Sequence, residues 1–196
     1  TGEANSKNAL AVGASNLPRP AFAPGEQDTA AAVEFSSRGP SGDGRIKPEL
    51  LAPASAVISA RSRLVEGNLP AYQEYTRLQG TSMAAAVAGG SSALLRQYFE
   101  EQMDLVTPSA ALFKAALVNG ARTAAGGPSR EGFGTIDLAG TVIALKEHTF
   151  SLADVWTGVS QGEELTYNFH VSSPASPFKA TLAWTDPPAA AGSIKT

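Results

Sequence analysis

The sequence predicts a chain of two unlike parts, an α/β part over residues 1–146 and an antiparallel β part over residues 147–196. Two observations predict this division. Residues 9–14 are short, apolar and contain a glycine, which is typical of a buried parallel strand, and helical patterns follow them. After the last helical pattern, apolar and polar residues alternate strongly in two segments, which is typical of half-buried antiparallel strands. We place the boundary near residues 146–150.

The remaining strands and loops of the first part follow from local composition. Residues 15–31 are rich in Pro, Gly and Ala and are expected to form a surface loop. Residues 50–53 are a short apolar run closed by proline, and residues 56–60 are a further strand candidate. Residues 61–79 are polar and irregular, so we expect no regular element there.

Three helices are expected in the first part. The longest spans roughly residues 82–100, where Ala, Leu, Met and Glu predominate and small residues leave the first turns almost without side-chain bulk. Thr107 has the character of an N-cap, and the helix after it is expected to run to about Asn119. A third helix is expected over residues 137–145.

The second part contains two alternating segments, residues 165–171 and residues 178–184. Both predict half-buried antiparallel strands. Two long strands do not make a stable β-sandwich by themselves. We therefore expect further chain after Thr196, or another chain, to complete a β-sandwich-like domain.

Composition excludes several classes of function. The chain has 196 residues, no cysteine and a net charge of -3, and its charges of both signs are spread along the sequence. Thiol catalysis, disulfides and cysteine-type zinc sites are therefore excluded. No basic stripe suggests nucleic acid, and no apolar stretch approaches the roughly 20 residues that cross a bilayer. We expect neither a nucleic-acid partner nor a membrane partner.

One segment has the residue types needed for nucleophilic chemistry, Gly80, Thr81, Ser82 and Met83. A serine hydroxyl is a weak nucleophile unless it is exposed, oriented and given a base. At a helix N-terminus, unpaired N–H groups and the helix dipole favour negative charge, so the Ser82 N–H can donate to an oxyanion. A Thr-Ser pair before an Ala-rich stretch is also the usual form of a helix cap. On the residues alone, both interpretations remain open.

Residues 80–85 (Gly-Thr-Ser-Met-Ala-Ala) resemble the nucleophile motif of the subtilisin-like serine proteases, the subtilases. Residues 35–53 resemble the segment that precedes the nucleophile helix in that family, and residues 9–14 resemble the strand before that segment. The three motifs occur in the family's order. The chain is most similar to bacterial alkaline proteases whose catalytic domain is followed by a β-barrel or jelly-roll domain. It departs from the family at Ala86, where proline is usual, and at Ala54, where glycine is common.

This resemblance implies a fold and a site. The fold is the C-terminal half of a three-layer α/β/α subtilisin-like domain with a mostly parallel sheet, followed by a partial antiparallel β-sandwich. The implied activity is a serine endopeptidase that hydrolyses peptide bonds of a polypeptide substrate through an acyl-enzyme on Ser82. The implied neighbours of the oxyanion site are Gly80, Thr81 and Met83, and Leu78 and Gln79 border the leaving-group side.

In the same family the catalytic Asp, the His and the oxyanion Asn all precede the serine. The resemblance therefore implies that this segment alone is inactive and that its partner is the N-terminal remainder of the protease, in the same or a companion chain. His148 and His170 follow the serine and are not expected to act as its base. No cofactor is required for the chemistry, a structural calcium ion is compatible with the family, and no ligands for it can be named. A secreted or extracellular protein is implied.

Two rival functions remain. The chain could be a non-catalytic fragment or an inactive binding module that keeps a subtilase shape. An esterase of the α/β-hydrolase kind fits less well, because that class places its serine in Gly-x-Ser-x-Gly. Ala84 stands where that motif has its second glycine.

Overall fold

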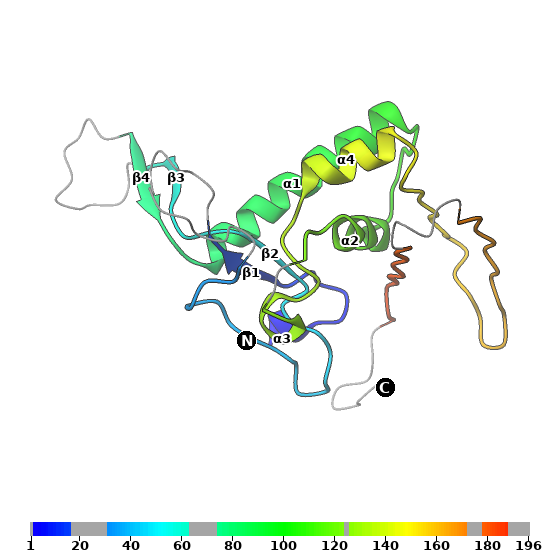
Figure 1. Cartoon of the computed structure of the whole chain (residues 1–196), viewed down its shortest axis with the longest axis horizontal. Helices are drawn as coiled ribbons and strands as arrows, with labels where there is room; N and C mark the ends of the chain where they lie inside the picture. The colour runs from blue at the N-terminus through cyan, green and yellow to red at the C-terminus, as the bar shows by residue number, and fades with distance from the viewer. Residues whose placement is uncertain (1, 17–30, 63–73, 124–125, 172–177, 188–196) are drawn as a thin grey trace.

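In a computed structural model, the chain forms a small parallel sheet against which three helices gather (Figure 1). The structure describes residues 2–16, 31–62, 74–123, 126–171 and 178–187.

The central sheet pairs β1 (Val12–Ser15) with β2 (Leu50–Pro53) in parallel. Single bridges extend it on both sides, at Ala32 antiparallel to β1 and at Thr135 parallel to β2. The predicted strand over residues 9–14 is confirmed from Val12 onward. Nearly all residues of both strands are buried, which explains why they form apolar runs rather than alternating ones.

The helices of the first part form close to where the sequence places them. They are α1 (Thr81–Gln102), α2 (Ala110–Asn119) and α4 (Leu138–Lys146), with a single turn, α3 (Pro128–Glu131), and a short 3-10 turn, η1 (Glu3–Asn5). The start of α2 differs from the prediction, because Ser109 rather than Thr107 is its N-cap. The Ser109 hydroxyl accepts a hydrogen bond from the Leu112 N–H at 3.1 Å, which satisfies an otherwise unpaired donor of the first turn.

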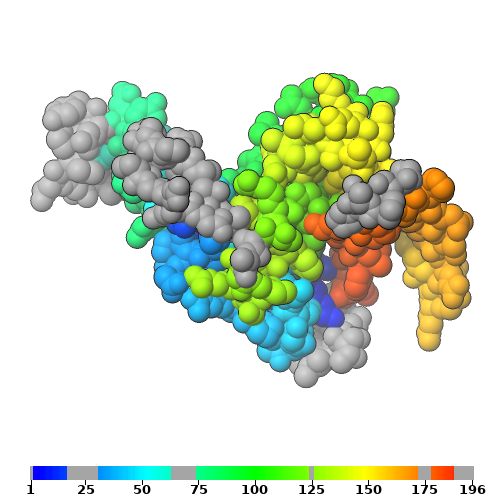
Figure 2. Space-filling view, viewed as in Figure 1, coloured from blue at the N-terminus to red at the C-terminus, as the bar shows by residue number. Residues whose placement is uncertain are grey.

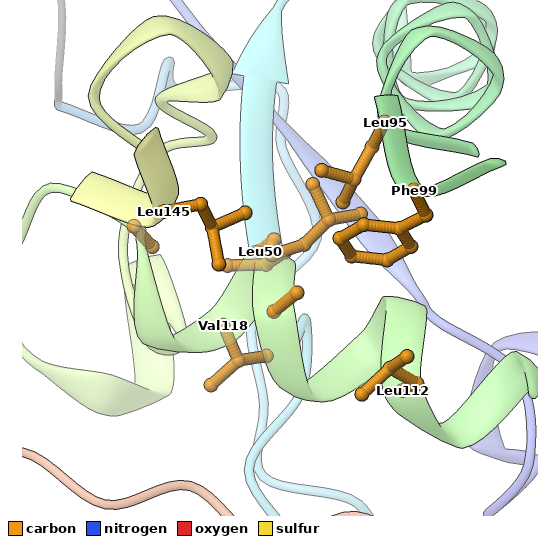
Figure 3. Close-up of a cluster of buried hydrophobic side chains, with 9 residues drawn as sticks. Leu50, Leu95, Phe99, Leu112, Val118 and Leu145 are labelled. Atoms are coloured by element: carbon orange, nitrogen blue, oxygen red, sulfur yellow. The ribbon is translucent and has the colours of Figure 1, made fainter. Parts of the chain in front are cut away.

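The main hydrophobic core lies where α1, α2, α4 and the start of β2 meet (Figure 3). Leu50, Leu95 and Phe99 are fully buried there, and each such side chain contributes about 1.5–3 kcal/mol by leaving water. The Phe99 ring also lies 5.4 Å from the Phe113 ring, centroid to centroid. This core fixes the C-terminal half of α1.

A second, small-residue cluster fixes the N-terminal half of α1. Its members are all alanines with no exposed surface: Ala14, Ala52, Ala54 and Ala84. Because alanine adds almost no bulk, the start of the helix approaches the sheet closely. The long helix is thus held at both ends by different packing.

A hairpin precedes α1 directly. β3 (Val57–Ala60) pairs antiparallel with β4 (Tyr75–Leu78), and Figure 1 shows it projecting beyond the sheet. The expectation of an irregular segment through residue 79 was wrong for β4. Four residues are too short for a clear alternation, and β4 is stabilised by β3, whose position the local pattern of β4 does not reveal.

The two strands predicted in the second part are not formed in the structure. Residues 165–171 and 178–184 have no strand hydrogen bonding among the described residues. Leu165 is 53% exposed and Leu182 is 82% exposed, so no neighbouring strand or core covers their apolar sides, and a strand of this kind needs both. Figure 2 shows the segment before residue 172, in orange, standing apart from the body of the molecule. The β-sandwich therefore stays unconfirmed, and the domain boundary at residue 146 stays a prediction.

Candidate active site

Gly80 joins the hairpin to the long helix. Its backbone has φ 149° and ψ 158°, a positive φ that side-chain-bearing residues rarely adopt. A Cβ at this position would meet only the Met83 Sδ at 3.5 Å, so conformation rather than space requires glycine. The Gly80 N–H donates to the Ala54 carbonyl at 3.1 Å, which ties the start of α1 to the end of β2.

Ser82 is the second residue of α1 and is exposed. Among the described residues, nothing is hydrogen-bonded to its hydroxyl. The Gly80 carbonyl already accepts from the N–H groups of Met83 and Ala84, at 3.0 and 3.4 Å. The N–H of Ser82 lies before these in the first turn, where a helix provides no backbone acceptor. An exposed hydroxyl and a free donor therefore share the positive end of a 22-residue helix.

The other predicted site residues lie around this point. Met83 is half-buried against the small-residue cluster, and Thr81 is half-buried at the first position of α1. Leu78 ends β4 and is 49% exposed, and Gln79 beside it is also exposed. The structure thus brings the predicted residues together on one short stretch between β4 and α1.

Neither histidine is near Ser82. His148 follows α4 and lines a cavity with Tyr98 and Gln102, which belong to the last turns of α1. Tyr98 is 16 residues beyond Ser82, which at the helical rise corresponds to about 24 Å. His170 belongs to the exposed segment before residue 172, and Figure 1 shows this segment, in orange, far from the start of α1. The described residues around Ser82 therefore include an exposed hydroxyl and a backbone N–H donor, but no imidazole.

The described residues also show no group of three His, Asp or Glu side chains arranged to hold a metal ion. A structural calcium ion stays a prediction. In the same described part of the chain, no helix is both long and apolar enough to cross a bilayer.

Sequence reasoning missed one feature that supports the site. Glu49, 5% exposed, precedes β2 and accepts from the Ala11 N–H at 2.7 Å. Its other oxygen contacts Lys47 Nζ at 2.6 Å and Lys114 Nζ at 3.0 Å. Lys47 and Glu49 stand two apart in the sequence, but Lys114 is far away on α2, so only the folded chain reveals the network.

Comparison with known proteins identifies the family. The family model of the peptidase S8 or subtilase family matches residues 2–135. The chain therefore belongs to the subtilase family.

Individual relatives share this assignment. The chain is 33% identical over 180 residues to the serine protease/ABC transporter B family protein tagA of Dictyostelium discoideum, a match covering 78% of this chain and 10% of that protein. It is 31% identical over 153 residues to C5a peptidase of Streptococcus pyogenes, covering 71% of this chain and 12% of that protein. The chain thus spans about a tenth of the length of these curated relatives.

A solved structure shows the same fold. The Clostridium perfringens CspB protease superimposes with a TM-score of 0.53 at 24% identity, covering 71% of this chain and 26% of that one. The subtilisin-like α/β class predicted from the sequence is therefore confirmed.

Proposed function

We propose that this chain carries the nucleophile of a subtilisin-type serine endopeptidase, with Ser82 as the residue that forms the acyl-enzyme. One observation carries the proposal. The Ser82 side chain is exposed at the N-terminus of a long helix, while Ala84, in the same turn, is completely buried against the sheet. The hydroxyl is therefore accessible on a rigidly held backbone, as a nucleophile requires.

The proposed chemistry uses the first turn of α1. Ser82 Oγ attacks the carbonyl carbon of the peptide bond while its proton passes to a base. The Ser82 N–H donates to the oxyanion that develops. The base returns the proton to the leaving amine, and water then hydrolyses the acyl-enzyme with the same base accepting its proton.

We propose that the base, a histidine, comes from a part of the protein outside these 196 residues, together with its Asp and an Asn oxyanion donor. The positions of the histidines in this chain support this proposal. The chain contains two histidines, and both lie far from Ser82. A lone serine nucleophile loses most of its rate advantage, so this chain by itself is expected to be inactive.

The leaving-group side of a polypeptide substrate is assigned to Leu78 and Gln79. Both are exposed and lie three to four residues before the nucleophile. A polypeptide bound at Ser82 passes this surface on one side. A secreted or extracellular location of the protein stays a prediction.

The test is peptide hydrolysis by the full-length protein with Ser82→Ala. Removing the nucleophile is expected to lower kcat by a factor on the order of 10⁶. Ser91→Ala is the matched control, because Ser91 lies on the same helix and its hydroxyl donates to the Val87 carbonyl at 2.9 Å. Activity retained by Ser82→Ala, with Ser91→Ala unchanged, would refute the assignment.

A second function, a non-catalytic module with a subtilase shape, is favoured by the absence of an imidazole near Ser82 in the described residues. The two functions differ in the full-length protein. A folded full-length protein that hydrolyses no peptide, in a panel of varied sequence, supports the module and contradicts the endopeptidase.

A further inference from the structure

The N-terminus of α2 is held by a carboxylate from the C-terminal part of the chain. Asp154 accepts two hydrogen bonds from Ser109, from its N–H at 2.8 Å and from its hydroxyl at 2.6 Å. Ser109 is the N-cap of α2. The negative charge of Asp154 therefore stands at the positive end of the helix dipole, where it is stabilising.

The C-terminus of α2 is held by an ammonium group from the same part of the chain. Lys179 Nζ donates to the carbonyls of Val118 and Asn119, at 3.1 and 2.6 Å. Asn119 Nδ2 donates in return to the Lys179 carbonyl at 3.2 Å and to Thr181 Oγ1 at 3.1 Å. Here a positive charge stands at the negative end of the dipole, so both charges have the favourable sign.

A third contact lies near the start of the chain. Asn8 and Asp186 exchange two hydrogen bonds, from Asn8 Nδ2 to the Asp186 carbonyl at 3.0 Å and from the Asp186 N–H to Asn8 Oδ1 at 2.9 Å. Lys7 Nζ adds an ion pair with the Asp186 carboxylate at 3.5 Å. These contacts join residues 178 positions apart.

These three attachments are polar, whereas several large apolar side chains of the same segment are exposed to solvent. Trp156 is 69% exposed, Leu182 is 82% exposed and Trp184 is 64% exposed. Leu152 packs against the main core, but beyond it burial of apolar area contributes little to holding the segment. Desolvation lowers the pKa of Lys179, which shows that this ammonium has given up part of its hydration to reach α2.

We propose that residues 153–171 and 178–187, here called the strap, form an electrostatic clasp that holds both ends of α2 and the N-terminal segment at Asn8. Leu152, just before the strap, packs against the hydrophobic core, and from Asp154 onward the strap is attached to the helical core through polar contacts. Leu112 and Val118 of α2 belong to the core that contains Phe99 of α1, so the strap steadies the packing of the nucleophile helix. Because the attachments are charged, salt weakens them. The proposal is independent of the proteolytic activity.

The test is hydrogen exchange of α2 amides in the full-length protein carrying Lys179→Met or Asp154→Asn. We expect each variant to exchange about tenfold faster at the end of α2 that it no longer holds, because a charge contact with a helix end is lost. Lys146→Met and Glu164→Gln are the controls, since each removes an exposed charge of the same sign, Lys146 at the end of α4 and Glu164 within the strap. Variants that exchange like the controls would overturn the proposal.

A second measurement needs no variant. Raising NaCl from about 0.05 M to about 1 M is expected to speed exchange at both ends of α2 and at the Asp186 N–H, and to leave the middle of α1 unchanged. Exchange at these positions that does not respond to salt, or that follows α1, would show that the charged contacts do not hold them and would also overturn the proposal.

Discussion

The geometry of the first turn of α1 is set by a few residues, each with a different structural role. Gly80 has a backbone conformation closed to other residues, Ala84 fills the space against the sheet, and Ser82 presents its hydroxyl to solvent. A change at Gly80 or Ala84 alters the direction of the proposed nucleophile without removing it, whereas a change at Ser82 removes it. Predictions at this scale therefore test the orientation of the Ser82 hydroxyl separately from its presence.

Gly80→Ala is expected to destabilise the protein by about 1–3 kcal/mol, because alanine is strained at φ 149°. It is also expected to lower kcat, since the turn must shift to relieve the strain. Gly89→Ala is the control: Gly89 lies inside α1 with open space around it, and alanine there is expected to stabilise by about 0.5–1 kcal/mol. Denaturant unfolding measures both. Equal effects of the two substitutions would contradict the assigned role of Gly80.

Peroxide is expected to remove most of the activity by oxidising Met83. A sulfoxide adds a polar oxygen to a half-buried side chain beside the nucleophile. The only other methionine, Met103, lies just past the other end of α1 and serves as an internal control. Met83→Leu is expected to keep its activity in peroxide. Full activity after mass spectrometry has confirmed the Met83 sulfoxide would contradict this.

At the scale of elements, polar contacts fix both ends of β2. At one end the Ala54 carbonyl accepts from the Gly80 N–H just before α1. At the other end the Glu49 carboxylate pairs with two lysines and accepts from the Ala11 N–H. Lys47 and Lys114 in turn donate to carbonyls of residues 6 and 7, at 2.9 and 3.1 Å. The strand that supports the nucleophile loop is thus linked to the N-terminal segment.

Glu49→Gln is expected to destabilise the protein by about 3–5 kcal/mol, because it leaves two lysine charges without their buried partner. The exposed pair of Arg96 and Glu100 on α1, 2.7 Å apart, provides the control. Glu100→Gln is expected to cost about 1 kcal/mol or less. Unfolding free energies of the two variants that differ by less than the error of the measurement would show that the network is not stabilising.

The same scale shows which elements the sequence could predict. α1 was predicted well because its small residues, its length and its N-terminal motif are all local. β4 was missed because its stability comes from β3, and the Glu49 network was missed because Lys114 is 65 residues away. Apolar and polar residues alternate over 165–171 as in a β-strand. A strand also needs a neighbouring strand for its backbone hydrogen bonds, and none lies beside this segment among the described residues.

For the whole molecule, the fold class and the place of Ser82 at a helix N-terminus could be predicted from the sequence, while the connections between parts could not. The motif around Ser82 is continuous in the sequence, so its position at a helix N-terminus followed directly. The strap depends on Asp154 and Lys179 meeting opposite ends of one helix, which no local pattern reveals. The chain also covers about a tenth of the length of its curated relatives. The proposal that the base comes from outside these 196 residues is therefore to be tested in the full-length protein.

The most direct test of the account is covalent labelling of the full-length protein with a fluorophosphonate, followed by mass spectrometric mapping of the modified residue. The probe reacts with a serine hydroxyl only where a base activates it and an oxyanion donor lies beside it. We expect a single adduct on Ser82, which disappears in Ser82→Ala and persists in Ser91→Ala. A folded protein that carries no label, or that carries it on another serine, would contradict the account.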